Sequence, residues 1–92
     1  MIKKILDEIK LIIEDKHDLN SLDFSYYLEE YLIEHYDRMY KENPIVTELL
    51  NEELPEICAM MEPGLDDTEF KKLLKKEYEK VMKQITNKHL LN

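Results

Sequence analysis

The residues of this 92-residue chain that are best suited to chemistry are its three histidines, its single cysteine and its many carboxylates. Glu14 and His17 have the Glu-x-x-His spacing that supplies one half of a di-iron site in helical bundles. The second half is missing, because Leu32 and Thr86 stand three residues ahead of the other two histidines. We therefore interpret His17 as a structural or surface residue.

Other patterns that could supply a nucleophile or a metal site are also incomplete. Cys58 falls on the apolar face of a predicted helix, with no nearby cation in the sequence to lower its pKa, so we expect a small buried hydrophobe. The turn with Asp66, Asp67 and Glu69 lacks the alternating ligand spacing of an EF-hand calcium loop. We therefore expect no catalytic residue, no metal and no cofactor, which argues against an enzyme.

The charge of the chain narrows the classes of partner. Lys and Arg number 13 against 21 Asp and Glu, so the formal net charge is −8. This excess disfavours direct binding of nucleic acid or of an anionic membrane, and it favours a cationic protein partner. The lone cysteine forms no internal disulfide, and no apolar run approaches the roughly 18 residues of a membrane span, so we expect a cytoplasmic protein.

Helices must position these side chains, because apolar residues recur at spacings of three and four almost throughout the chain. The expected helices cover about 2–16, 21–41, 44–61 and 66–86, and 87–92 should fray. Short connections between them predict an all-α fold. We expect a compact antiparallel four-helix bundle that forms a single domain over residues 1–92.

Local signals support these boundaries. Ser21 or Asp23 should cap the second helix, and Asn43 followed by Pro44 is a strong start signal for the third. Pro55 removes a backbone donor inside that helix, so it should either kink the helix or split it.

The negative charge is concentrated in one block. Nine acids and no Lys or Arg lie between Glu42 and Glu69, whereas seven lysines and two acids follow from Phe70 onward. One interpretation is a solvated helix face, since acids near helix starts are favoured by the macrodipole. A surface of one sign is better explained by a cationic partner, because solubilising surfaces usually mix both signs.

Candidate contacts to such a partner are carboxylates of this block and tyrosines on a face of the second helix that its core stripe does not use. They are Glu52, Glu53, Glu56, Glu62, Asp66, Asp67 and Glu69, with Tyr26, Tyr36 and Tyr40. Tyrosine beside carboxylate suits a protein interface. The alternative is that a small bundle buries these tyrosines along its edges.

Short motifs across about residues 20–82 resemble the colicin D immunity protein family. They are Asp23-Phe24-Ser25, Asn43-Pro44-Ile45, Glu52-Glu53-Leu54, Glu62-Pro63 followed by Asp66 and Asp67, and Leu73-Leu74-Lys75-Lys76-Glu77. The sequence departs from the family at Gly64, where an acid is expected after the proline, and at Pro55, which interrupts the third helix.

The resemblance implies a small four-helix bundle that binds the nuclease domain of a colicin or contact-dependent-inhibition toxin. Such a domain is a basic ribonuclease that cuts tRNA in the anticodon loop, and the immunity protein covers its active site with an acidic surface. Glu62 would belong to the segment that faces the toxin. We expect a protein that is a monomer or a weak dimer when free.

Two other functions stay open from the sequence. The first is another acidic mimic of nucleic acid, such as a phage protein that blocks a host nuclease. The second is a membrane-associated immunity protein against a pore-forming bacteriocin, because the last predicted helix is rich in lysine.

Overall fold

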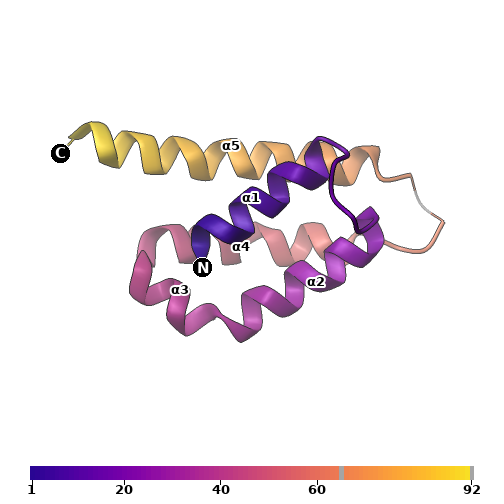
Figure 1. Ribbon diagram of the computed structural model, residues 1–92, viewed down its shortest axis with the longest axis horizontal. Helices are drawn as coiled ribbons and strands as arrows, with labels where there is room; N and C mark the ends of the chain where they lie inside the picture. Colours follow the sequence, from indigo (N-terminus) through magenta and orange to yellow (C-terminus); the bar gives the residue numbers. More distant parts are fainter. Residues whose placement is uncertain (65, 92) are drawn as a thin grey trace.

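The computed structural model describes residues 1–64 and 66–91, with side chains through residue 86. Within this part the chain is all-α and has five helices (Figure 1). They are α1 (Ile2–Ile13), α2 (Ser21–Glu34), α3 (Tyr36–Glu42), α4 (Pro44–Ala59) and α5 (Thr68–Leu91). The all-α class is confirmed, whereas the expected count of four helices is wrong.

The count differs because the predicted helix over 21–41 is broken at His35. The backbone of His35 leaves helical geometry at φ −109° and ψ 12°, although its N–H still bonds to the carbonyl of Tyr31. Figure 1 shows the change of direction between α2 and α3. Beyond the break, Met39 is fully buried while Tyr36 and Tyr40 are exposed.

The helix starts are set by asparagine caps. The side chain of Asn20, and not that of Ser21 or Asp23 as predicted, accepts the N–H of Asp23 at 2.8 Å and caps α2. Asn43 accepts the N–H of Val46 at 3.1 Å, and Pro44 occupies the first position of α4 as expected.

Two predicted helix ends were wrong, and one of the two alternatives left open at Pro55 is excluded. α1 stops at Ile13 and not near residue 16, because Asp15 adopts a left-handed φ of 60°. α4 is one helix through the exposed Pro55 and is not split there. α5 begins after a turn in which Gly64 has φ 88° and runs to Leu91, past the predicted end near 86; residue 92 lies outside the described part.

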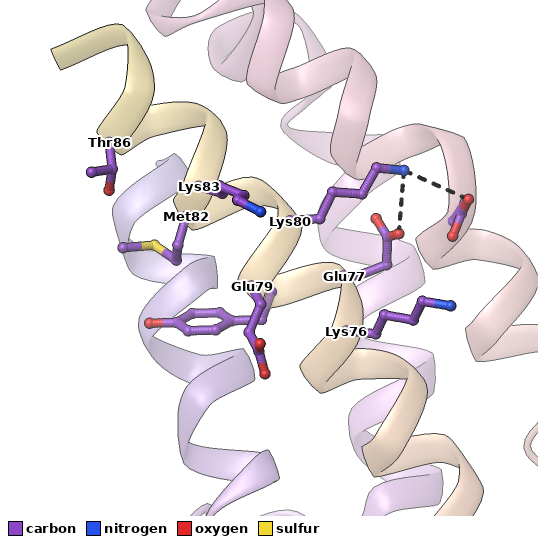
Figure 2. Close-up of a pocket in the computed structure, with 9 residues that line it drawn as sticks. Lys76, Glu77, Glu79, Lys80, Met82, Lys83 and Thr86 are labelled. Carbon is purple, nitrogen blue, oxygen red and sulfur yellow. Dashed lines mark ion pairs between the residues drawn. The ribbon is translucent and has the colours of Figure 1, made fainter. Parts of the chain in front are cut away.

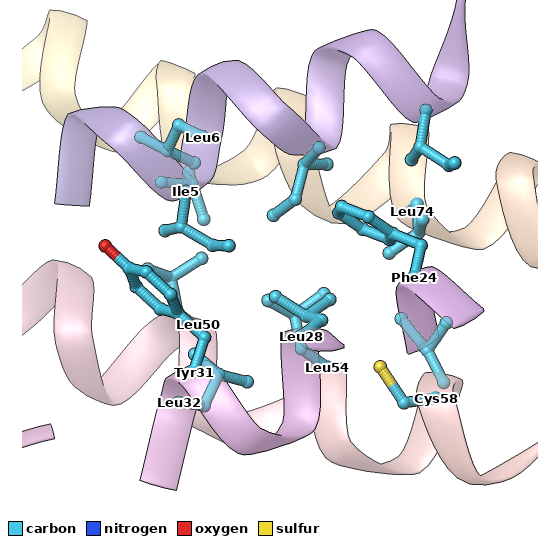
Figure 3. Close-up of a cluster of buried hydrophobic side chains, with 14 of the residues drawn as sticks. Ile5, Leu6, Phe24, Leu28, Tyr31, Leu32, Leu50, Leu54, Cys58 and Leu74 are labelled. Atoms are coloured by element: carbon cyan, nitrogen blue, oxygen red, sulfur yellow. The ribbon is translucent and has the colours of Figure 1, made fainter. Parts of the chain in front are cut away.

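The core lies where the apolar faces of α1, α2, α4 and α5 meet (Figure 3). Ile5, Phe24, Leu28, Leu54 and Leu74 are each at most 1% exposed. α4 packs against α5, α3 and α2, and α1 covers α5 and α2. One side of α4 is therefore left facing solvent. None of the described helices combines the length and apolar character needed to cross a membrane.

Candidate functional site

The acidic block between Glu42 and Glu69 divides into two sets in the structure. One set is held by hydrogen bonds and ion pairs within the chain. The other set is exposed, and no ion pair or hydrogen bond engages its carboxylates among the described side chains. The distinction decides which acids are available to another molecule.

Asp67 belongs to the engaged set. Its carboxylate accepts the hydroxyl of Ser21 at 2.6 Å and lies 3.1 Å from the ammonium of Lys71, which also pairs with Asp15. The Ser21 hydrogen bond and the Lys71 charge hold the pKa of Asp67 below its ordinary value. This cluster ties the start of α5 to α2 and to the end of α1.

Asp66 and Glu42 are also engaged, each by a backbone group. Asp66 accepts the hydroxyl of Thr68 at 2.7 Å and the N–H of Thr68 at 2.9 Å, and these bonds lower the pKa of the carboxyl and hold the turn that leads into α5. Glu42 accepts the N–H of Ile2 at 3.2 Å, and this bond lowers its pKa. Both carboxylates therefore hold neighbouring parts of the chain in place.

Glu53 is engaged through α5. The ammonium of Lys80 lies 3.7 Å from carboxylate oxygens of both Glu53 and Glu77, and Figure 2 shows it beside Glu77 in the groove between α4 and α5. Glu77 is only 3% exposed, and its Oε2 atom has no hydrogen-bond partner among the described atoms. Burial, with Glu53 nearby, raises the pKa of Glu77 to about 7.

Glu77 was not among the residues that the sequence predicted to be functional. Its spacing in the sequence indicates a buried position, because Glu77 falls on the stripe formed by Phe70, Leu74 and Val81, all of which are buried. An acid at an apolar position of a helix is a candidate for a perturbed pKa.

The exposed set is centred on α4. Glu48, Glu52 and Glu56 are exposed and follow one another at intervals of four residues, so they form a single stripe on the solvent side of α4. We call these three residues the α4 stripe. Glu62 and Glu69 are exposed on either side of the turn that leads to α5. Glu48 was missing from the predicted contacts, although its spacing from Glu52 and Glu56 was visible in the sequence.

The three predicted interface tyrosines are exposed, and they fall into two places. Tyr36 and Tyr40 lie on α3, where their rings stack with centroids 5.9 Å apart and an interplanar angle of 23°. Tyr26 lies on α2 and is 56% exposed, two helical turns from Ile33, which is 80% exposed. The edges of the bundle therefore leave all three rings accessible.

Tyr36 and Tyr40 meet the α4 stripe at a hollow of about 390 Å³ between α3 and α4. Glu48 lines this hollow from α4, and Asp37 and Lys41 complete its lining from α3. The structure thus brings two of the predicted tyrosines to one end of the stripe.

His17 and Cys58 were the candidates for a metal ligand and a nucleophile, and both contribute to the packing of the fold. Nδ1 of His17 accepts the N–H of Leu19 at 3.0 Å, and its ring meets Phe24 edge-on with centroids 5.0 Å apart. Cys58 is 3% exposed, and burial raises the pKa of its thiol to about 12, so the thiolate nucleophile is disfavoured. Within the described residues no three His, Cys, Asp or Glu side chains cluster as metal ligands do.

Positive charge gathers on α5. Lys72, Lys75, Lys76 and Lys83 are exposed there, at positions of the helix that do not contribute to the core. Lys76 also lines a hollow between α4 and α5 together with Glu53 and Glu56, so the basic residues of α5 border the acidic residues of α4 there. Comparison of the chain with protein-family models, with curated proteins and with solved structures gives no significant match.

Proposed function

We propose that this chain is an immunity protein that binds a cognate basic tRNA-cleaving nuclease toxin and covers its active site with an acidic surface. The observation that carries the proposal is the α4 stripe, three exposed glutamates on one helix, none of which forms an ion pair with the described side chains. Unpaired glutamates of this kind are an advantage to a protein whose binding partner supplies the positive charges.

In this proposal the carboxylates of the α4 stripe imitate the phosphate groups of tRNA. A nuclease that binds tRNA presents lysine and arginine side chains to phosphate groups. Carboxylates on successive turns of a helix are about 6 Å apart along its axis, a regular array of negative charge that such side chains can pair with. Opposite net charges also speed association, by about 10- to 1000-fold at low salt.

In this proposal the α4 stripe is the centre of the contact surface. Glu62 and Glu69 extend it at one end, and Tyr36 and Tyr40 extend it at the other. Glu53, Asp66 and Asp67 have partners within the chain, so they act at the rim and contribute less. Tyr26 lies on α2 and is not part of this surface.

The short motifs that resemble the colicin D immunity protein family support the same proposal. The family's four-helix bundle would correspond to this fold if α2 and α3 together take the place of one helix. Pro55 does not divide the proposed surface, because α4 is continuous through it and Glu52 and Glu56 remain on one stripe. A cytoplasmic location and a free state that is a monomer or a weak dimer belong to the proposal.

The proposal is tested with the toxin domain encoded next to the gene. The purified chain should bind that domain and protect tRNA from cleavage in a stoichiometric assay. A domain that neither binds the chain nor loses activity in its presence contradicts the proposal.

A second candidate rests on the exposed lysines of α5, which suit an anionic surface. On this reading the chain would be a membrane-associated bacteriocin immunity protein. Flotation with vesicles containing about one-third anionic lipid separates the two, because an immunity protein against a nuclease should stay with the unbound fraction. A phage protein that blocks a host nuclease shares the physics of the leading proposal, and a pull-down from host extract distinguishes it.

A further inference from the structure

Tyr36 and Tyr40 form an aromatic pair that the core does not use. They are 36% and 41% exposed, although their rings stack on each other, and the buried side chain of α3 is Met39. Ile45, three residues ahead of Glu48 on α4, is 51% exposed and adds apolar surface at the same end of the stripe. Apolar surface gathered in this way is typical of a contact site for another molecule.

The hollow beside this pair combines aromatic and acidic groups from two helices. Tyr36 and Tyr40 contribute ring surface from α3, and Glu48 contributes a carboxylate from α4, opposite Asp37 and Lys41. An anionic group would meet two carboxylates here. A neutral apolar group would bury those carboxylates without a partner, which costs free energy. A flat cationic group satisfies both kinds of surface.

We propose that this hollow binds an arginine side chain of the partner. A guanidinium is planar, so it can lie against a tyrosine ring while its parallel N–H groups donate to the carboxylate of Glu48. A lysine ammonium can pair with Glu48 but cannot stack in this way. This inference takes one assumption from the proposed function, which is that the partner is cationic.

Lys41 gives the hollow its own cation. In the free protein it reduces the negative potential beside Glu48, and an arriving arginine must compete with it. Replacing Lys41 with alanine should therefore tighten binding of arginine, whereas replacing Glu48 with glutamine should weaken it. The opposite signs of these two changes are a signature of this site.

The test uses two peptide probes of equal charge, hexa-arginine and hexalysine, titrated into the ¹⁵N-labelled protein. We expect hexa-arginine to bind about fivefold more tightly, with the largest shift changes at Tyr40, Lys41 and Glu48. Tyr40→Ala and Glu48→Gln should each reduce the preference for arginine to near unity. Tyr26→Ala, an exposed tyrosine on α2, is the matched control and should leave the preference intact, and circular dichroism checks the fold of every variant.

Equal affinities for the two peptides, shift changes centred elsewhere, or an equal loss in Tyr26→Ala would each overturn the site. The peptide titrations test the arginine site independently of the proposed function, because they do not use the toxin domain. An arginine preference at the hollow without binding of the toxin domain would overturn only the function. Binding of the toxin domain that Tyr40→Ala and Glu48→Gln leave unchanged would overturn only the site.

Discussion

The hydroxyl of Ser21 donates a 2.6 Å hydrogen bond to the carboxylate of Asp67, across 46 residues of sequence. Ser21 is the first residue of α2 and is 5% exposed, and Asp67 directly precedes α5. The bond therefore fastens the first turn of one helix to the start of another. It also occupies a carboxylate that the sequence alone placed in the interface.

Loss of this bond should destabilise the fold and leave partner binding nearly intact. Ser21→Ala removes the donor, and we expect the free energy of unfolding to fall by about 1 kcal/mol in urea denaturation. A double-mutant cycle with Asp67→Ala, which removes the acceptor, should give a coupling of similar size. Additive effects of the two substitutions would show that the bond contributes nothing.

The same coupling should depend on pH. The pKa of Asp67 is lowered in the folded state, so its stabilisation is present above the ordinary carboxyl pKa and is lost as pH falls through the folded value. The coupling between Ser21 and Asp67 should therefore be full at pH 7 and shrink in strong acid. Urea denaturation of the four proteins of the cycle at both pH values measures this change.

Glu77 should make stability depend on pH in the opposite direction. Burial raises its pKa to about 7 in the folded state, so its favourable contribution is full below about pH 4.5 and is lost as pH rises to about 7. Glu77→Gln keeps the neutral shape, and we expect this variant to gain about 3 kcal/mol relative to the wild type between pH 4.5 and pH 8. The measurement is the difference between their urea denaturation curves across this range.

Glu79→Gln is the matched control, because Glu79 is exposed two residues further along α5. Its difference from the wild type should stay constant over the same pH range. If Glu77→Gln behaves in the same way, then the buried carboxyl of Glu77 ionises as an ordinary one does, and the account of the groove between α4 and α5 is wrong.

Adjacent glutamates on α4 should differ in their effect on partner binding. Glu52 is exposed on the α4 stripe, whereas Glu53 faces α5 and pairs with Lys80 at 3.7 Å. We expect Glu52→Lys to weaken binding of the toxin domain by about tenfold or more, and Glu53→Gln by less than about threefold. Calorimetric titration of both variants tests this order, and the reverse order would move the interface to the groove between α4 and α5.

The sequence predicted best what depends on neighbouring residues along the chain. The apolar spacing of α1 and the Asn43-Pro44 start of α4 follow from helix geometry and capping alone, and the structure confirms both. The break at His35 was not predictable in this way, because the spacing of apolar residues continues past it to Met39. α3 packs against α4 beyond the break, and the spacing of residues along the chain does not show a contact between these two segments.

The candidate site also has features that the sequence predicted and features that depend on contacts between distant segments. The sequence identified the acidic block and the exposed tyrosines, because charge and residue type are visible in it. It could not tell that Asp67 bonds to Ser21 or that Glu53 shares Lys80 with Glu77, since these contacts join distant segments. Folding therefore leaves a smaller exposed set of the nine acids without a partner among the described side chains, and this set includes Glu48, which was not among the predicted contacts.

The most direct test of the account is the salt dependence of binding to the toxin domain encoded next to the gene. The wild-type chain should bind that domain with an affinity that falls steeply between about 50 and 500 mM NaCl, because salt screens exposed charges. A variant with Glu48, Glu52 and Glu56 all changed to glutamine should bind more weakly at low salt and lose most of this dependence. No binding by the wild type, or the same salt dependence in both proteins, would contradict the claim that the α4 stripe forms the interface.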